Sequence, residues 1–121
     1  MRHPTRDLPP DRWTACLEEF ARERRDAPTV LRIAQDGDGP VVAEHGLLLR
    51  DLGYDPRRDV LHVTVFHPDS GLEQAFEHVV SGPVRVSVDS PEGIVPTAVT
   101  IEDREGVTMT LGVPLQAEFS G

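Results

Sequence analysis

The sequence predicts an α+β fold, with one N-terminal amphipathic helix packed on a mostly antiparallel sheet of six or seven strands. Apolar residues first recur with the 3.6-residue period of a helix, and from about residue 29 they recur with the two-residue period of strands. The segments between the expected strands are short and rich in turn formers. Parallel strands would need long crossovers, so antiparallel pairing is expected. A sheet curled into a partial barrel is the alternative shape.

The helix is expected over residues 10–26. Its apolar stripe consists of Trp13, Cys16, Leu17, Phe20 and Ala21. A proline pair precedes the stripe and another proline follows it, which marks the two ends of the helix. Cys16 is the single cysteine, so neither an internal disulfide nor a thiolate metal cage can form. Its place on the stripe predicts a buried, unreactive thiol.

The expected strands cover residues 29–34, 41–54, 60–66, 73–80, 84–88, 97–102 and 107–111. The second of these is either two strands or one long strand bent at Gly46. Residues 73–80 alternate only partly, so a short helix is the alternative there. With 121 residues, the chain has the length of one domain. We expect a flexible arm over residues 1–9, a single domain over 10–113 and a tail over 114–121.

The charge balance disfavours several classes of protein. The chain has 12 basic and 21 acidic residues and a formal net charge of −9, whereas proteins that follow nucleic-acid phosphates need a basic face. All the basic residues are arginine, and asparagine is also absent, which indicates either a GC-rich genome or adaptation to salt. No apolar run is long enough to span a bilayer, and the N-terminus lacks a secretory pattern, so a cytoplasmic protein is expected.

Three groups of residues carry a resemblance to a known family. They are Pro10-Asp11-Arg12-Trp13 with Leu17 and Phe20, Tyr54-Asp55-Pro56-x-x-Asp59-x-Leu61-x-Val63, and Pro83-x-Arg85-Val86-x-Val88-Asp89 with Ala98-x-x-Ile101-x-Asp103-x-x-Gly106-x-Thr108. Together they resemble a family of small uncharacterised bacterial proteins, a domain of unknown function that opens with an aspartate-x-tryptophan helix. The middle group is also similar to a second uncharacterised family built around a tyrosine-aspartate-proline turn. The resemblance covers about residues 8–113 and implies a compact α+β fold, but no activity.

Candidate partner-binding residues lie in three places. Arg57 and Arg58 are expected at the tip of a turn, where two arginines can contact an anion or a protein partner. Trp13 is a further candidate contact at the start of the helix. Leu115 and Phe119 are apolar residues in the tail, which can dock on the sheet or on another copy of the chain.

Two strand histidines suggest an alternative. His62 and His78 can lie opposite or diagonal to each other if strands 60–66 and 73–80 form a hairpin, and neutral imidazoles are common metal ligands. A third ligand would come from Glu44, His45 or Glu77. No motif in the sequence predicts a cofactor, and no catalytic motif is present.

The sequence therefore favours a non-enzymatic binding or scaffold module that self-associates or binds a protein partner. A metal-dependent protein or enzyme that uses the two histidines is one alternative. An acidic regulator of a basic partner is another, and it requires the negative charge to be concentrated on one face.

Overall fold

The computed structural model describes residues 5–35, 41–67, 75–89 and 98–112. In chain order the elements are β1 (Thr5–Asp7), the 3-10 helix η1 (Pro10–Arg12), α1 (Trp13–Glu23), β2 (Pro28–Gln35), β3 (Val41–Asp55), β4 (Val60–Phe66), β5 (Ala75–Ser81), β6 (Pro83–Asp89), β7 (Ala98–Asp103) and β8 (Val107–Gly112). One helix and a sheet make up the fold, which confirms the predicted α+β class.

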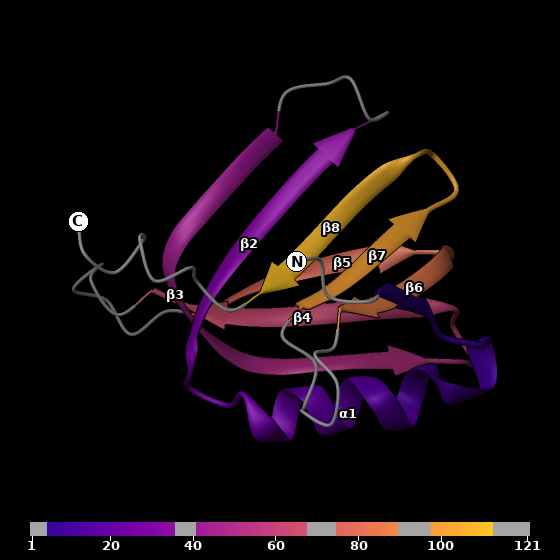
Figure 1. Cartoon of the computed structure of the whole chain (residues 1–121), viewed down its shortest axis with the longest axis horizontal. Helices are drawn as coiled ribbons and strands as arrows, with labels where there is room; N and C mark the ends of the chain where they lie inside the picture. Colours follow the sequence, from indigo (N-terminus) through magenta and orange to yellow (C-terminus); the bar gives the residue numbers. More distant parts are fainter. Residues whose placement is uncertain (1–4, 36–40, 68–74, 90–97, 113–121) are drawn as a thin grey trace.

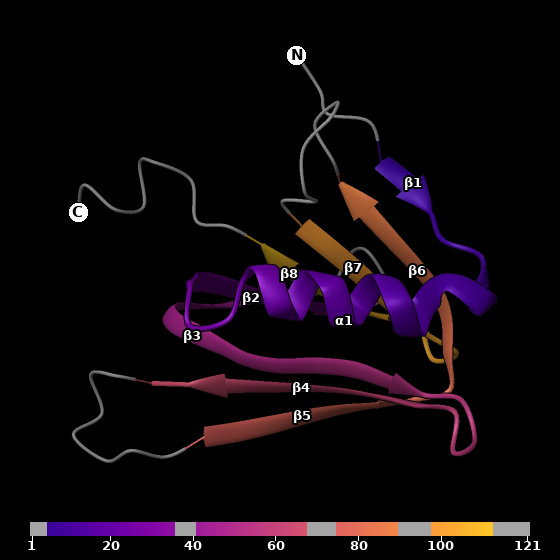
Figure 2. The same cartoon turned by 90° about the horizontal axis from the view of Figure 1, so that it is seen from below.

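The strands form one sheet in the order β1-β6-β7-β8-β2-β3-β4-β5, and all neighbours run antiparallel. The helix α1 runs along one side of the sheet (Figure 1). The sheet bends strongly, and seen from the helix side β3, β4 and β5 lie to one side of α1 while β1, β6, β7 and β8 lie to the other (Figure 2). Its two end strands, β1 and β5, do not pair with each other, so the sheet is open. The partial-barrel alternative therefore describes the curvature of the sheet but not its closure.

The described residues contain eight strands, so the expected six or seven was too few. The additional strand is β1, which pairs with β6 and lies within the segment expected to be a flexible arm. The backbone N–H of Leu8 also donates to the carbonyl of Val86 at 2.8 Å, which extends this attachment. Short polar segments like β1 carry little periodicity, so only the pairing partner identifies them as strands.

The helix is shorter than expected. Residues 10–12 form a 3-10 turn, in which the N–H of Arg12 donates to the carbonyl of Pro9 at 2.8 Å, and α1 begins only at Trp13. At the other end α1 stops at Glu23, because Asp26 adopts a positive φ of 60° and its N–H donates to the carbonyl of Leu49. The helix thus ends where the chain attaches to β3, before Pro28.

Strand β3 is one long strand bent at Gly46, which decides between the two alternatives that the sequence left open. Gly46 has a φ of +73°, a conformation that favours glycine. The pairing with β2 shifts register at the same level, between Thr29 and Leu31, which is the signature of a β-bulge. After this bend, the second half of β3 runs alongside α1 and packs against it (Figure 2).

The core lies between α1 and the inner face of the sheet. The helix contributes Trp13, Leu17, Phe20 and Ala21, and every strand from β2 to β8 contributes at least one buried apolar side chain. Strand β4 alternates regularly, with Leu61, Val63 and Val65 buried. Strand β5 contributes only Val80, so most of its side chains lie outside the core.

Candidate functional site

Strand β5, at one end of the sheet, carries two of the three large apolar side chains that are exposed among the described residues. One side of β5 pairs with β4 over all seven residues, and no described segment pairs with its other side. Phe76 is 40% exposed and Val79 is 54% exposed. Figure 2 shows β5 as the lowest strand of the molecule, at the edge farthest from the helix. An edge strand presents free backbone N–H and C=O groups, which a further strand can pair with.

The other end of the sheet is protected in a way that β5 is not. Strand β1 has only three residues, two of them the charged Arg6 and Asp7, and a proline pair follows it after Leu8. The Arg85 guanidinium contacts Asp7 at 3.0 Å, which anchors this edge further. Short length, charge and proline all oppose the addition of a strand. Strand β5 has no proline or arginine and carries only Glu77 as a formal charge.

The register with β4 assigns the β5 side chains to two faces. Phe76 is opposite the buried Val65, and His78 is opposite the buried Val63, so these two side chains lie on the inner face. Val79 is opposite His62 on the outer face. Phe76 also makes an edge contact with His67, whose ring lies 5.0 Å away, which restricts the Phe76 side chain.

A hydrogen-bonded cluster fixes the end of β5 relative to the rest of the fold. The Tyr54 hydroxyl donates to Oδ1 of Asp59 at 2.7 Å, and Nη2 of Arg104 donates to Oδ2 at 3.2 Å. The N–H of Gly82, the residue between β5 and β6, donates to the Asp59 carbonyl at 2.9 Å. Asp59 therefore joins the β3–β4 turn, the β7–β8 turn and the β5–β6 corner.

The same hydrogen bond changes the ionisation of Tyr54. Because the Asp59 carboxylate accepts a hydrogen bond from the Tyr54 hydroxyl, the pKa of Tyr54 is raised above its ordinary value of 10.0. Burial and the charges of Asp59 and Asp55 act in the same direction. The Trp13 ring packs edge-on against Tyr54, with ring centroids 5.1 Å apart. The residues of two of the sequence motifs thus meet in one structural cluster. Sequence spacing could not reveal this cluster, because Arg104 is 45 residues from Asp59.

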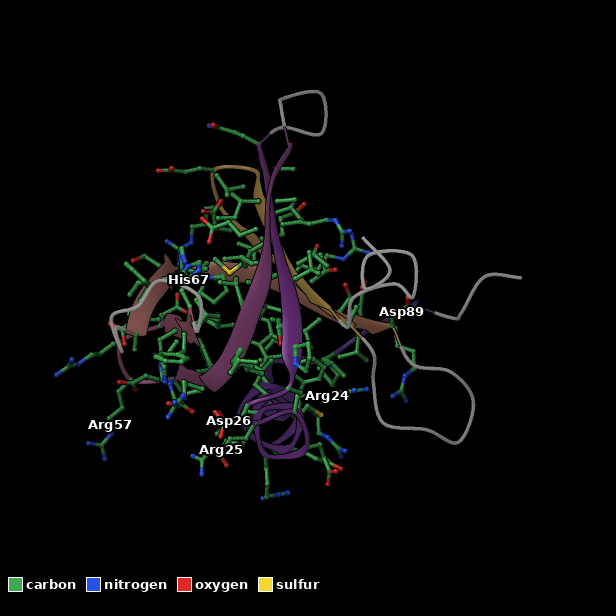
Figure 3. The ribbon with its side chains drawn as sticks, turned by 90° about the vertical axis from the view of Figure 1, so that its left-hand side faces the viewer. Arg24, Arg25, Asp26, Arg57, His67 and Asp89 are labelled. Carbon is green, nitrogen blue, oxygen red and sulfur yellow. The ribbon has the colours of Figure 1, made fainter. Side chains whose placement is uncertain are left out.

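The predicted contact residues have different outcomes. Trp13, predicted as a partner contact, is only 4% exposed, and its indole N–H donates to the carbonyl of Leu8, so the side chain lies in the core rather than on the surface. Its ring is needed in the core, where it covers Tyr54. Arg57 and Arg58 are exposed at the tip of the β3–β4 turn, and Figure 3 shows Arg57 pointing away from the protein. Their backbone N–H groups donate to Oδ1 of Asp55, which closes the turn.

The proposed histidine pair does not exist. His62 pairs with Val79 and His78 with Val63, so the two imidazoles point to opposite faces of the sheet and cannot share an ion. His62 instead lies over Gly53 and approaches Oδ2 of Asp51 at 3.3 Å. Across the described ranges, no three His, Cys, Asp or Glu side chains are grouped as a metal site.

Other predicted residues fall elsewhere. Glu44 approaches His67 at 3.6 Å rather than the predicted ligands His62 and His78. Glu77 lies opposite Thr64 on the outer face of β5. Leu115, Phe119, the tail and the side chain of His45 lie outside the described residues. Cys16 is only partly buried, which corrects the expectation that it belongs to the core. The buried positions of the stripe fall on the side facing β3, and Cys16 lies at its margin.

The sequence patterns do not identify β5 as the edge strand. Alternation indicates that a segment is a strand, but sheet order decides whether that strand lies inside the sheet or at its edge.

In the part of the chain that the structure describes, no helix has the length and apolar character needed to cross a membrane.

These features define a small α+β protein with a curled antiparallel sheet, one covering helix and, within the described residues, a sheet edge at β5 that no strand pairs with. The chain belongs to the family of unknown function DUF5335, whose model matches residues 4–117. This span includes β1 and all the elements that follow it. Comparisons with curated proteins and with solved structures gave no match.

Proposed function

We propose that this protein is a binding module that self-associates through the edge of β5. The observation that carries the proposal is the difference between the two ends of the sheet. Strand β5 offers seven residues whose outer side pairs with no described segment, together with two exposed large apolar side chains, whereas β1 is short and charged. Strand addition at such an edge provides main-chain hydrogen bonds for affinity and side-chain contacts for specificity.

The exposed apolar side chains support this role over a purely structural one. Monomeric proteins protect sheet edges with charges, prolines or bulges, because an open edge promotes uncontrolled association. Phe76 and Val79 instead place apolar surface on both faces of the open strand. Burial of this surface in an interface contributes roughly 25 cal/mol per Å² of apolar area. The exposure of Phe76 and Val79 therefore favours association.

Measurement of the mass in solution tests the proposal. Light scattering coupled to size-exclusion chromatography should give twice the 13.3 kDa chain mass for the natural sequence. Val79→Glu should shift the equilibrium to monomer, because it puts a charge on the open edge. Val84→Glu is the matched control, since Val84 is similarly exposed, at 49%, but lies on β6.

Two results would contradict the proposal. A monomer at all concentrations up to the millimolar range would show that the edge does not self-associate. Equal effects of the two glutamate substitutions would show that added charge, rather than its place on β5, controls assembly. Circular dichroism of both variants checks that the fold is retained.

A further inference from the structure

We infer that the partner of β5 is the β5 strand of a second copy, paired antiparallel about a two-fold axis at His78. This inference rests on the proposed self-association and adds its geometry. A two-fold axis perpendicular to the sheet keeps the inner face of one copy continuous with the inner face of the other. Residues directly opposite each other must then share a face. One residue of β5 is therefore opposite the same residue of the other copy, and the axis lies midway between these two.

The axis at His78 is the one that uses the whole strand. Since β5 extends from Ala75 to Ser81, His78 is its central residue, and an axis there pairs all seven residues. An axis at Glu77 would pair only residues 75–79 and place two carboxylates directly opposite each other. An axis at Val79 would pair only residues 77–81 and leave Phe76 beyond the paired segment.

The cross-strand contacts in this register are chemically compatible. On the inner face, the half-exposed Phe76 of each copy is opposite Val80 of the other, which extends the apolar core across the axis. On the outer face, Glu77 of each copy is opposite Val79 of the other, so no two carboxylates are directly opposed. The two His78 rings meet at the axis itself.

The protected edge explains why assembly would end at two copies. In the dimer the β5 edges of both copies are paired with each other, and a β1 strand lies at each end of the joined sheet. Because β1 is short, charged and followed by prolines, it does not accept another strand. An interface that uses the same strand from both copies is isologous and closes on itself.

Substitution of Val79 by residues of opposite charge tests the register. In the inferred dimer each Val79 is opposite Glu77 of the other copy, so the two-fold symmetry produces two equivalent contacts. Val79→Glu should therefore raise the dimer dissociation constant about tenfold, whereas Val79→Lys should leave it within about threefold of the natural value. An axis at Val79 would instead oppose two like charges in both variants, and both would dissociate equally.

Cysteine cross-linking supplies an independent measurement. In a Cys16→Ser background, His78→Cys places the two introduced thiols opposite each other at the axis, within the Cα separation of about 4.4–6.8 Å that a disulfide requires. Val79→Cys displaces its two thiols by two residues along the strands, which puts their Cα atoms about 8 Å apart. Mild oxidation should therefore yield a covalent dimer from His78→Cys and little from Val79→Cys.

The outcomes separate this inference from the proposed function. A dimer that depends on β5 but cross-links through Val79→Cys, or dissociates equally with Val79→Lys and Val79→Glu, would overturn the two-fold axis at His78 and leave the edge interaction intact. A natural chain that remains monomeric would overturn both. Efficient cross-linking of His78→Cys together with tolerance of Val79→Lys would support the inferred pairing.

Discussion

Replacement of Tyr54 by phenylalanine tests whether the Asp59 cluster stabilises the corner where β5 continues into β6. The substitution removes the hydroxyl that donates to Asp59 at 2.7 Å. The aromatic ring is kept, so the edge contact with Trp13 is preserved. The variant therefore isolates one hydrogen bond to a carboxylate.

The expected loss of stability follows from the environment of this bond. A hydrogen bond to a charged group stabilises a protein by about 1.5–3 kcal/mol when it is well buried. Tyr54 and Asp59 are only partly buried, and Asp59 retains the contact with Arg104 at 3.2 Å. We therefore expect Tyr54→Phe to lower the free energy of unfolding by about 1 kcal/mol, which corresponds to a Tm lower by about 4 °C.

The chain composition makes this measurement direct. Trp13 is the single tryptophan and is buried beside Tyr54, so its fluorescence follows unfolding by urea. Arg104→Gln is a suitable comparison, because its side chain is 72% exposed and such surface ion pairs contribute little. We expect Arg104→Gln to cost less than Tyr54→Phe.

The pH dependence supplies a second assay of the same contact. Tyr54 is the single tyrosine, so the ultraviolet absorbance of tyrosinate follows the ionisation of this group alone. The raised pKa means that the unfolded chain releases the Tyr54 proton near pH 10.0 and the folded protein releases it at higher pH. In the window between these values the unfolded state binds fewer protons, so stability falls as pH rises. The Tyr54→Phe variant should lack this fall.

A tyrosinate midpoint at or below the ordinary value of 10.0 in the folded protein would contradict the raised pKa of Tyr54. An unchanged free energy of unfolding in Tyr54→Phe would contradict the expected loss of stability. Either result would mean that the Asp59 contact does not persist in solution.

Three further variants have outcomes that the structure predicts. Gly82→Ala should destabilise the protein by about 1–2 kcal/mol in urea unfolding, since Gly82 has a φ of +64° and a Cβ there would lie 3.1 Å from Nε of Arg104. Leu17→Ala should cost about 2–5 kcal/mol by the same assay, because Leu17 is 0% exposed in the core, and a loss below 1 kcal/mol would disagree. The double variant Arg57→Ala/Arg58→Ala should change stability by less than about 0.5 kcal/mol, as both side chains project into solvent, and light scattering should give an unchanged mass.

The location of most elements could be predicted because their patterns are local. The apolar stripe that includes Leu17 and Phe20 predicts a helix whichever surface it covers, and the alternation of β4 predicts a strand whichever strand it pairs with. The exact end of α1 was not predictable, because the N–H of Asp26 finds its acceptor on Leu49, in a strand that comes later in the chain. Strand β1 was missed for a related reason, since its pairing with β6 spans most of the chain.

The candidate site was harder to predict because it depends on sheet order. His62 and His78 look equivalent in the sequence, and one residue of register decides that they occupy opposite faces. Tryptophan is a residue type enriched in binding interfaces, but Trp13 is buried and packs against Tyr54. Arg57 and Arg58 were placed correctly at an exposed tip, because Asp55 closes that turn through local hydrogen bonds.

The α+β class, the helix and the exposed turn could be predicted because each depends on neighbouring residues. The choice of a single strand bent at Gly46, the strand at the open edge and the meeting of motif residues at Asp59 depend instead on long-range pairing. Edges and clusters of this kind arise from pairing between distant segments. The free energy of such pairing depends on every other strand in the sheet, so it is not encoded in any short stretch of the chain.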